Sequence, residues 1–186
     1  MFLTAVTSFS NNMLRNNFAD LVSTRRGEYL IRRGDKFTAA RRLLWQRKFA
    51  DVKILMGDFN AQIGPDRTGF ENVMGKEAMG RRTDNGERLL SMCSSNELKV
   101  GGSIFAHKHI HKGTWRSPDG STVNQIDHIC ISWRWTSALQ DVRVYHGTDV
   151  ASDHYLLVAK LKMKLKCRDK SRTLHFSLIF SFATSK

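Results

Sequence analysis

Short apolar runs that carry an aspartate at one end are the strongest constraint on the fold of this 186-residue chain. The run Lys53–Met56 leads into Gly57-Asp58, and the run 126–132 carries Asp127 near its start. Runs of this kind are typical of strands buried on both faces, where successive side chains must be apolar. An ionised carboxylate in such a strand is costly unless it is paired or hydrogen-bonded. Both aspartates are therefore candidates for a site at the edge of a buried sheet.

Helix and turn signals alternate with these runs. Residues 60–80 form a Gly-rich loop, after which Asn85 predicts a helix N-cap and Leu89, Leu90 and Cys93 predict the buried face of that helix. Further elements are a short strand ending at Gly101-Gly102, a turn at Ser117–Gly120, and strands at 142–145 and 155–161. Strands mixed with helices predict an α/β layered fold.

The charge distribution divides the chain into three zones. The net charge is +13, yet residues 51–160 hold 13 Lys/Arg and 13 Asp/Glu. Residues 1–50 hold 10 Lys/Arg against 3 acids, and residues 161–186 hold 7 against 1. We expect a basic segment of unclear structure at 1–50 with a helix at 37–49, a folded part at 51–166, and a tail at 167–186 that is peripheral or disordered. Basic flanks of this kind either bind phosphates or are simply solvated.

The cysteines and apolar segments indicate the compartment. Cys93, Cys130 and Cys167 are widely spaced and lack a CxxC pattern, which argues against a zinc site or a disulfide framework. The first ten residues make a poor signal peptide, and the apolar patch 174–182 is too short to span a bilayer. We expect an intracellular protein with no membrane partner, nuclear if it is functional. The oligomeric state is left open.

Three short motifs carry the candidate chemistry. They are Gly57-Asp58-Phe59-Asn60, Asn124-Gln125-Ile126-Asp127-His128 and Ser152-Asp153-His154. Each places a carboxylate at the edge of an apolar strand, where sites commonly form. Taken singly, the first motif is more typical of an Asx turn than of a site, and the third is as typical of a surface turn as of a site.

In this order the motifs resemble the C-terminal portion of the endonuclease/exonuclease/phosphatase superfamily, which includes deoxyribonuclease I. Further short segments are similar to the endonuclease domain of RTE-type LINE retrotransposons: Asn85–Arg88, Gly101–Phe105, Thr114-Trp115 and Ser117–Asp119. The resemblance covers roughly residues 52–166. It implies an α/β fold of two layered sheets, like that of deoxyribonuclease I, incomplete at its N-terminus.

The resemblance also implies roles for five residues in Mg²⁺-dependent hydrolysis of DNA, with Mn²⁺ as the alternative ion. Asp58 would act as general base towards the attacking water, and Asn60 would donate its amide to a phosphate oxygen. His154 would stabilise charge on the phosphate, and Asp127 would orient that histidine. Asp153 would face the metal.

The superfamily's principal metal-ligand glutamate has no counterpart that can be identified here. Glu28 and Asn11 or Asn12 are the only candidates by residue type for the early ligands, and none lies at the end of an apolar strand. We therefore expect a truncated copy of a DNA-nicking endonuclease, either active or decayed. The alternatives are a non-catalytic nucleic-acid-binding remnant that uses the basic flanks, and a phosphatase acting on lipid or nucleotide phosphates.

Two further features remain open at this stage. Trp115 resembles an aromatic residue near the family's substrate groove, but a core position is equally compatible with the sequence. His107, His109 and His111 alternate between Lys108 and Lys112. We expect a solvated or phosphate-facing loop there rather than a metal site.

Overall fold

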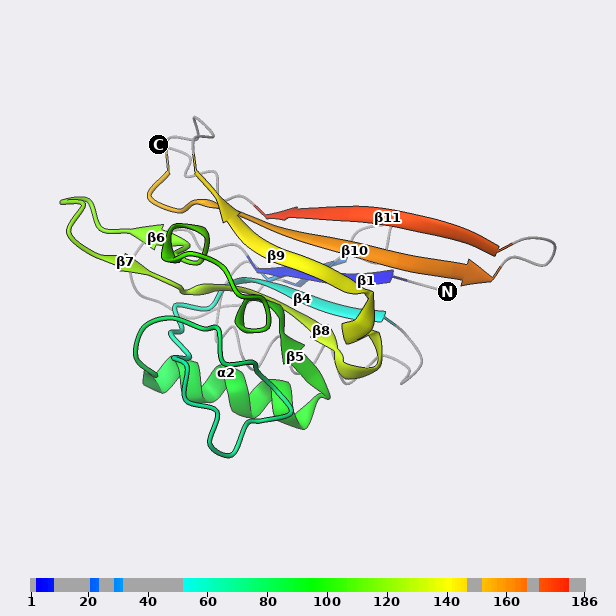
Figure 1. The fold of residues 1–186 in the computed structure, drawn as a ribbon, viewed down its shortest axis with the longest axis horizontal. Helices are drawn as coiled ribbons and strands as arrows, with labels where there is room; N and C mark the ends of the chain where they lie inside the picture. The colour runs from blue at the N-terminus through cyan, green and yellow to red at the C-terminus, as the bar shows by residue number, and fades with distance from the viewer. Residues whose placement is uncertain are drawn as a thin grey trace.

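The computed structural model describes the backbone of residues 3–8, 21–23, 29–31, 52–146, 152–166 and 171–180, and the side chains of residues 52–146 and 152–162. Its architecture is α/β, as the sequence predicts (Figure 1). The expected helix at 37–49 lies outside the described residues, and so do Glu28, Asn11, Asn12 and Cys167.

Two sheets and a small hairpin contain the described strands. The larger sheet has the order β2-β3-β1-β4-β8-β5, and its strands are β1 (Leu3–Ser8), β2 (Leu21–Ser23), β3 (Tyr29–Ile31), β4 (Val52–Asp58), β5 (Leu98–Val100) and β8 (Asp127–Ser132). The smaller sheet has the order β11-β10-β9, from β9 (Leu139–Tyr145), β10 (Leu156–Lys166) and β11 (Ser171–Phe180). The hairpin pairs β6 (Trp115–Arg116) with β7 (Val123–Asn124).

Helical elements connect and cover the strands. The long helix is α2 (Asp84–Ser95), and the short 3-10 turns are η1 (Gly101–Ser103), η2 (His109–His111) and η3 (Trp133–Ala138). No helix among the described residues is long and apolar enough to cross a membrane.

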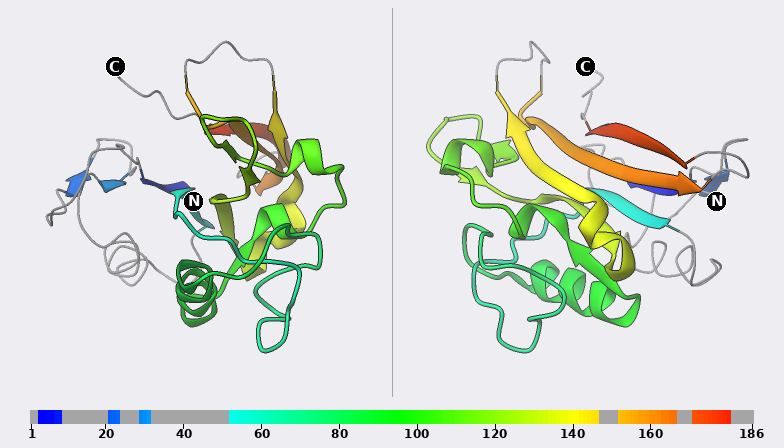
Figure 2. Two further views of the ribbon diagram at one scale, coloured as in Figure 1. Left: turned by 90° about the vertical axis from the view of Figure 1, so that its left-hand side faces the viewer. Right: turned by 45° about the vertical axis from the view of Figure 1, so that its right-hand side comes forward.

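Strands β4 and β8 form the middle layer of the molecule because both of their faces are buried. On one face, Ile54 and Ile129 belong to a core shared with β9 and β10. On the other face, Leu55 and Cys130 pack against α2. Figure 2 shows the resulting order of layers from two further sides: the smaller sheet, then β4 and β8, then α2. The two-layered sheet packing expected from the sequence is therefore confirmed.

The α2 helix is capped two residues earlier than the sequence suggests. Its N-cap is Thr83, whose hydroxyl accepts a hydrogen bond from the Gly86 amide at 3.2 Å. The prediction of Asn85 as N-cap is wrong, since the Asn85 side chain donates instead to the carbonyl of Asn60 at 3.1 Å. The predicted buried face is confirmed, because Leu89, Leu90 and Cys93 are fully buried.

Both flanks contain strands that the sequence did not predict. Residues 171–180, expected to be part of a peripheral tail, form β11 and pair antiparallel with β10 along its full length. Within the basic segment 1–50, β1 lies parallel to β4 and continues the larger sheet. Each strand finds its partner far away or across a hairpin, and local sequence patterns carry little information about such pairing.

Three side chains of the histidine-rich loop are packed rather than solvated. The His107 ring lies 2.6 Å from a carboxylate oxygen of Asp141 on β9, and His111 contacts the carbonyl of Val144 at 3.2 Å. Lys112 pairs with Glu77 at 3.1 Å. The expectation of a solvated or phosphate-facing loop is wrong for these three side chains, because partners on β9 and the preceding loop hold them.

Candidate active site

Strands β4 and β8 place two carboxylates opposite each other at one end of the larger sheet. Asp58 is the last residue of β4 and is the direct antiparallel partner of Asp127, the first residue of β8. Both are buried, with exposed fractions of 4% and 2%. Like charges at directly opposed positions repel each other, so this pair needs compensating donors or cations. Two of the three sequence motifs thus meet at a single point.

His154 supplies a donor to this pair from the segment that precedes β10. Its Nδ1 lies 3.0 Å from Oδ2 of Asp127, and the Asp127 side chain is 1% exposed. His154 also forms an isolated β-bridge with Trp115, which fixes its backbone beside the β6–β7 hairpin. The Oδ1 atom of Asp127 has no hydrogen-bond partner within the described residues. The arrangement holds the imidazole by one nitrogen and directs the ring's Nε2 away from the aspartate.

Burial and charge shift the protonation of this pair. Burial raises the pKa of Asp127 to about 6, although the hydrogen bond and charge of His154 act against this shift. Desolvation lowers the pKa of His154, but the hydrogen bond to Asp127 and the charges of Asp127, Asp58 and Asp153 outweigh it, so the pKa is raised. Near pH 7 Asp127 is therefore ionised, and His154 is protonated more often than a free histidine would be.

Asn60 lies in a tight turn directly after β4. Its φ of 49° is in the left-handed region, which asparagine tolerates better than most residues. The backbone amide of Asn60 donates to Oδ1 of Asp58 at 2.7 Å, and the backbone carbonyl of Asn60 accepts from the Asn85 side chain. The turn therefore holds Asp58 and leaves the exposed carboxamide of Asn60 beside the carboxylates.

Asp153 lies next to His154 and is held by Trp115. The indole Nε1 of Trp115 donates to Oδ2 of Asp153 at 2.8 Å, and the Arg116 amide donates to the Asp153 carbonyl at 2.9 Å. Trp115 is half-buried beside Asp153, so the structure favours a position at the site for this tryptophan over a position in the core.

The described residues match a hard divalent cation in ligand type. Oxygen ligands suit Mg²⁺, which is commonly held by one or two carboxylates together with waters and substrate phosphate. Oδ1 of Asp153 has no hydrogen bond within the described part of the chain, so it is available as such a ligand. Among residues 52–146 and 152–162, no group of three His, Cys, Asp or Glu side chains could hold one metal ion. Asp153 therefore stays a predicted ligand.

Two residues of the site had no predicted role. The buried Thr114 accepts hydrogen bonds through its hydroxyl from the amides of Ile126 and Asp127 at 2.9 and 3.0 Å. His128 is fully buried on the opposite face of β8, and its Nε2 lies 2.7 Å from the carbonyl of Ala61, in the turn after Asp58. Burial lowers the pKa of His128 to about 4, so the ring is neutral and donates this hydrogen bond. The sequence signal that could have indicated a structural role for His128 is its place as a polar residue among the largely apolar positions 126–132.

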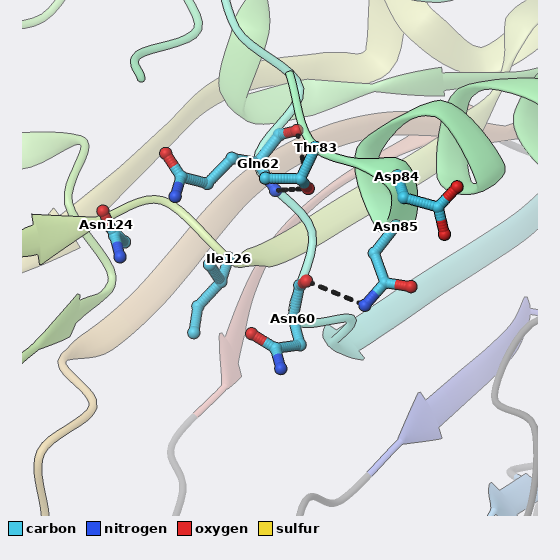
Figure 3. Close-up of a pocket in the computed structure, with 7 residues that line it drawn as sticks. All are labelled: Asn60, Gln62, Thr83, Asp84, Asn85, Asn124 and Ile126. Atoms are coloured by element: carbon cyan, nitrogen blue, oxygen red, sulfur yellow. Dashed lines mark hydrogen bonds between the residues drawn. The ribbon is translucent and has the colours of Figure 1, made fainter. Parts of the chain in front are cut away.

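A polar pocket adjoins these residues (Figure 3). Its volume is about 260 Å³, and it is lined by Asn60, Gln62, Thr83, Asp84, Asn85, Asn124 and Ile126. Asn60 lies two residues after Asp58, and Ile126 lies directly before Asp127. The pocket is therefore continuous in sequence with the paired strand ends.

Comparison with known proteins gives partial matches. No family model matches the chain. It is 36% identical over 121 residues to craniofacial development protein 2 of Tragulus javanicus and of Bos taurus, in each case over 65% of this chain. The match covers 21% and 20% of those proteins, so the chain spans about a fifth of the length of these curated relatives.

Two solved structures from Neisseria match part of the chain. The 3'-5' exonuclease NExo of Neisseria meningitidis is 19% identical, with a TM-score of 0.49. The 3' phosphatase NExo, bound to a product DNA hairpin, is 21% identical, with a TM-score of 0.47. Each match covers 67% of this chain and 51% of the other. TM-scores below 0.5 do not establish a common fold, so the two-sheet architecture rests on this chain's own strands.

Proposed function

We propose that this chain hydrolyses phosphodiesters with the help of Mg²⁺, as a DNA-nicking endonuclease of the type found in RTE-type LINE retrotransposons. The observation that carries the proposal is the hydrogen bond of 3.0 Å between His154 and Asp127, with Asp58 directly opposite Asp127. Three motifs separated by up to about a hundred residues converge there. Their order along the chain resembles that of the endonuclease/exonuclease/phosphatase superfamily, which supports the choice of reaction and of DNA as substrate.

The roles proposed for the individual residues are those that the resemblance implies. Asp58 takes a proton from the attacking water as general base. His154, made more basic by Asp127, offers a protonated imidazole to the negative charge that grows on the phosphate oxygens. Asn60 presents its carboxamide as a donor to a non-bridging oxygen. Asp127 acts through His154 by fixing its orientation.

Asp153 is the residue that would hold the metal. Bound Mg²⁺ would polarise a phosphate oxygen and neutralise charge on it. The hydrogen bond from Trp115 sets the orientation of the Asp153 carboxylate and leaves Oδ1 for this role. A substitution of Trp115 should therefore raise the Mg²⁺ concentration that nicking requires. Its effect on the free energy of unfolding should be small by comparison.

A plasmid-nicking assay with Mg²⁺ tests the proposal. His154→Ala removes the charged donor, and we expect nicking to fall about 100-fold or more, the size typical of losing one charge-stabilising group. The matched control is His109→Ala, because His109 is an exposed histidine outside the site and should nick like the native chain. Absence of nicking by the native chain, or equal nicking by the native chain and His154→Ala, would overturn the proposal.

The Asp127–His154 pair can also be tested without catalysis. An NMR titration of the His154 ring should give a pKa above the ordinary histidine value in the native chain, and a lower value in Asp127→Asn. The reason is that desolvation then acts on the ring without the opposing negative charge of Asp127. An unchanged pKa would show that the two side chains do not interact in solution.

A further inference from the structure

The pocket beside Asn60 has a composition that the proposed reaction does not explain. Four carboxamide side chains line it, those of Asn60, Gln62, Asn85 and Asn124. In Figure 3 the amides of Gln62 and Asn124 lie on the same side of the turn as the side chain of Ile126. Asn85 donates to the carbonyl of Asn60. Within the described part of the chain, the side-chain amides of the other three, Asn60, Gln62 and Asn124, form no hydrogen bond. Each offers both a donor and an acceptor.

The position of Gln62 is held by its surroundings. Its backbone carbonyl accepts from the Thr83 amide at 3.0 Å, and its own amide donates to the Thr83 hydroxyl at 3.3 Å. A Cβ at Gly80 would lie 2.2 Å from Oε1 of Gln62, so this glycine leaves the space that the Gln62 side chain occupies. Its carboxamide is therefore presented from a fixed backbone.

The charge of the lining favours a neutral occupant of this pocket over a phosphate. No Lys, Arg or His lines it, and its one charged residue is Asp84, an acid. The Asp84 carboxylate points away from the three carboxamides in Figure 3. A neutral ligand with donors and acceptors along its edge fits better, and Ile126, the one apolar residue of the lining, offers a surface for a flat face. A nucleobase has both properties.

We propose that this pocket binds the nucleobase of the nucleoside adjoining the scissile phosphate, with Gln62 and Asn124 contacting its edge. The inference rests on the proposed function, since Asn60 belongs to both sites: it follows Asp58 closely and also lines the pocket. A phosphate at the carboxylates and a base in the pocket would both lie beside Asn60, as two parts of one nucleotide would. The carboxamides then select for a base at that position.

Binding of a thymidine dinucleotide, measured by NMR titration in EDTA, tests the assignment without hydrolysis. The probe is compared with two forms in which the 5' or the 3' base is replaced by hydrogen. For the native chain, removal of one of the two bases should raise Kd about tenfold, a typical value for losing a set of base-edge hydrogen bonds. Removal of the other base should have a smaller effect.

Substitutions in the pocket should remove this discrimination. Gln62→Met keeps the length of the side chain but removes the donor and acceptor of its carboxamide. Asn124→Leu likewise replaces the Asn124 carboxamide with an apolar side chain of similar size. Either variant should bind the complete and the base-deleted dinucleotides with Kd values within about twofold of each other. The matched control is Gln140→Met on the exposed face of β9, which should discriminate like the native chain. Thermal unfolding of each variant establishes that it is folded.

Two outcomes would overturn the assignment. One is that base removal on either side leaves the Kd of the native chain unchanged. The other is that folded Gln62→Met and Asn124→Leu both keep the native discrimination. Failure of the proposed catalytic function is separate, because it appears as absent nicking while the base-dependent Kd in EDTA is retained. His154→Ala should accordingly lose nicking and still discriminate the base.

Discussion

At the start of β8, two neighbouring residues serve opposite faces of the sheet. Asp127 faces the smaller sheet and holds His154, whereas His128 faces α2 and donates to the carbonyl of Ala61. The sequence predicted the role of Asp127 because a carboxylate in an apolar strand requires a partner. It did not predict the role of His128, because its partner is a backbone carbonyl, which no residue type identifies.

The buried state of His128 predicts a loss of stability in acid. Its folded pKa of about 4 lies below the ordinary value of 6.5, so between these values the unfolded chain binds more protons. The stabilisation is complete above pH 6.5 and is lost as the pH falls towards 4, by up to about 3 kcal/mol. The unfolding free energy, measured by urea denaturation, should therefore fall more steeply from pH 6.5 to 4 in the native chain than in His128→Gln.

His128→Gln is a suitable comparison because its side-chain amide can still donate to Ala61. Asp127 and His154 have raised pKa values, which act in the opposite direction: they favour the folded chain at lower pH and lose this effect as the pH rises. Both chains share that contribution, so the difference between them isolates His128. Parallel pH curves would contradict a neutral, buried histidine.

The N-terminus of α2 connects the helix to the site. The Thr83 hydroxyl caps Gly86 and also accepts from the amide of Gln62, in the loop that continues from Asn60. In the helix itself, Asn85 bonds to the Asn60 carbonyl and so supports the left-handed turn beside Asp58. The sequence showed that a helix starts here, but it predicted Asn85 as the cap, and the structure has Thr83 two residues earlier.

Thr83→Ala should destabilise the protein by about 1 to 2 kcal/mol, because the cap and the hydrogen bond to Gln62 are lost together. Thr83→Ser keeps the hydroxyl and is the matched control, for which we expect a change below about 0.5 kcal/mol. Urea denaturation at pH 7 measures both values. Equal unfolding free energies for the two variants would mean that Thr83 does not cap α2 in solution.

Across the whole molecule, the sequence predicted the elements better than their partners. The central layer could be predicted because β4 and β8 are short, apolar and buried on both faces. The candidate site residues could be proposed because they belong to three ordered motifs. The positions of β1 and β11 were not, because each pairs with a strand through backbone hydrogen bonds that leave no local periodic signal.

The place of β11 at the edge of the smaller sheet gives the last prediction. It pairs with β10 from Lys166↔Ser171 to Leu157↔Phe180, so deleting residues 171–186 would expose the hydrogen-bonding edge of a strand eleven residues long. Long unpaired edges recruit strands from other molecules. We expect the deletion to self-associate in sedimentation velocity experiments, whereas deletion of 181–186 alone, which keeps β11, should sediment like the full chain. If both deletions sediment alike, β11 does not cover β10 in solution, and residues 167–186 are the peripheral tail that their composition suggested.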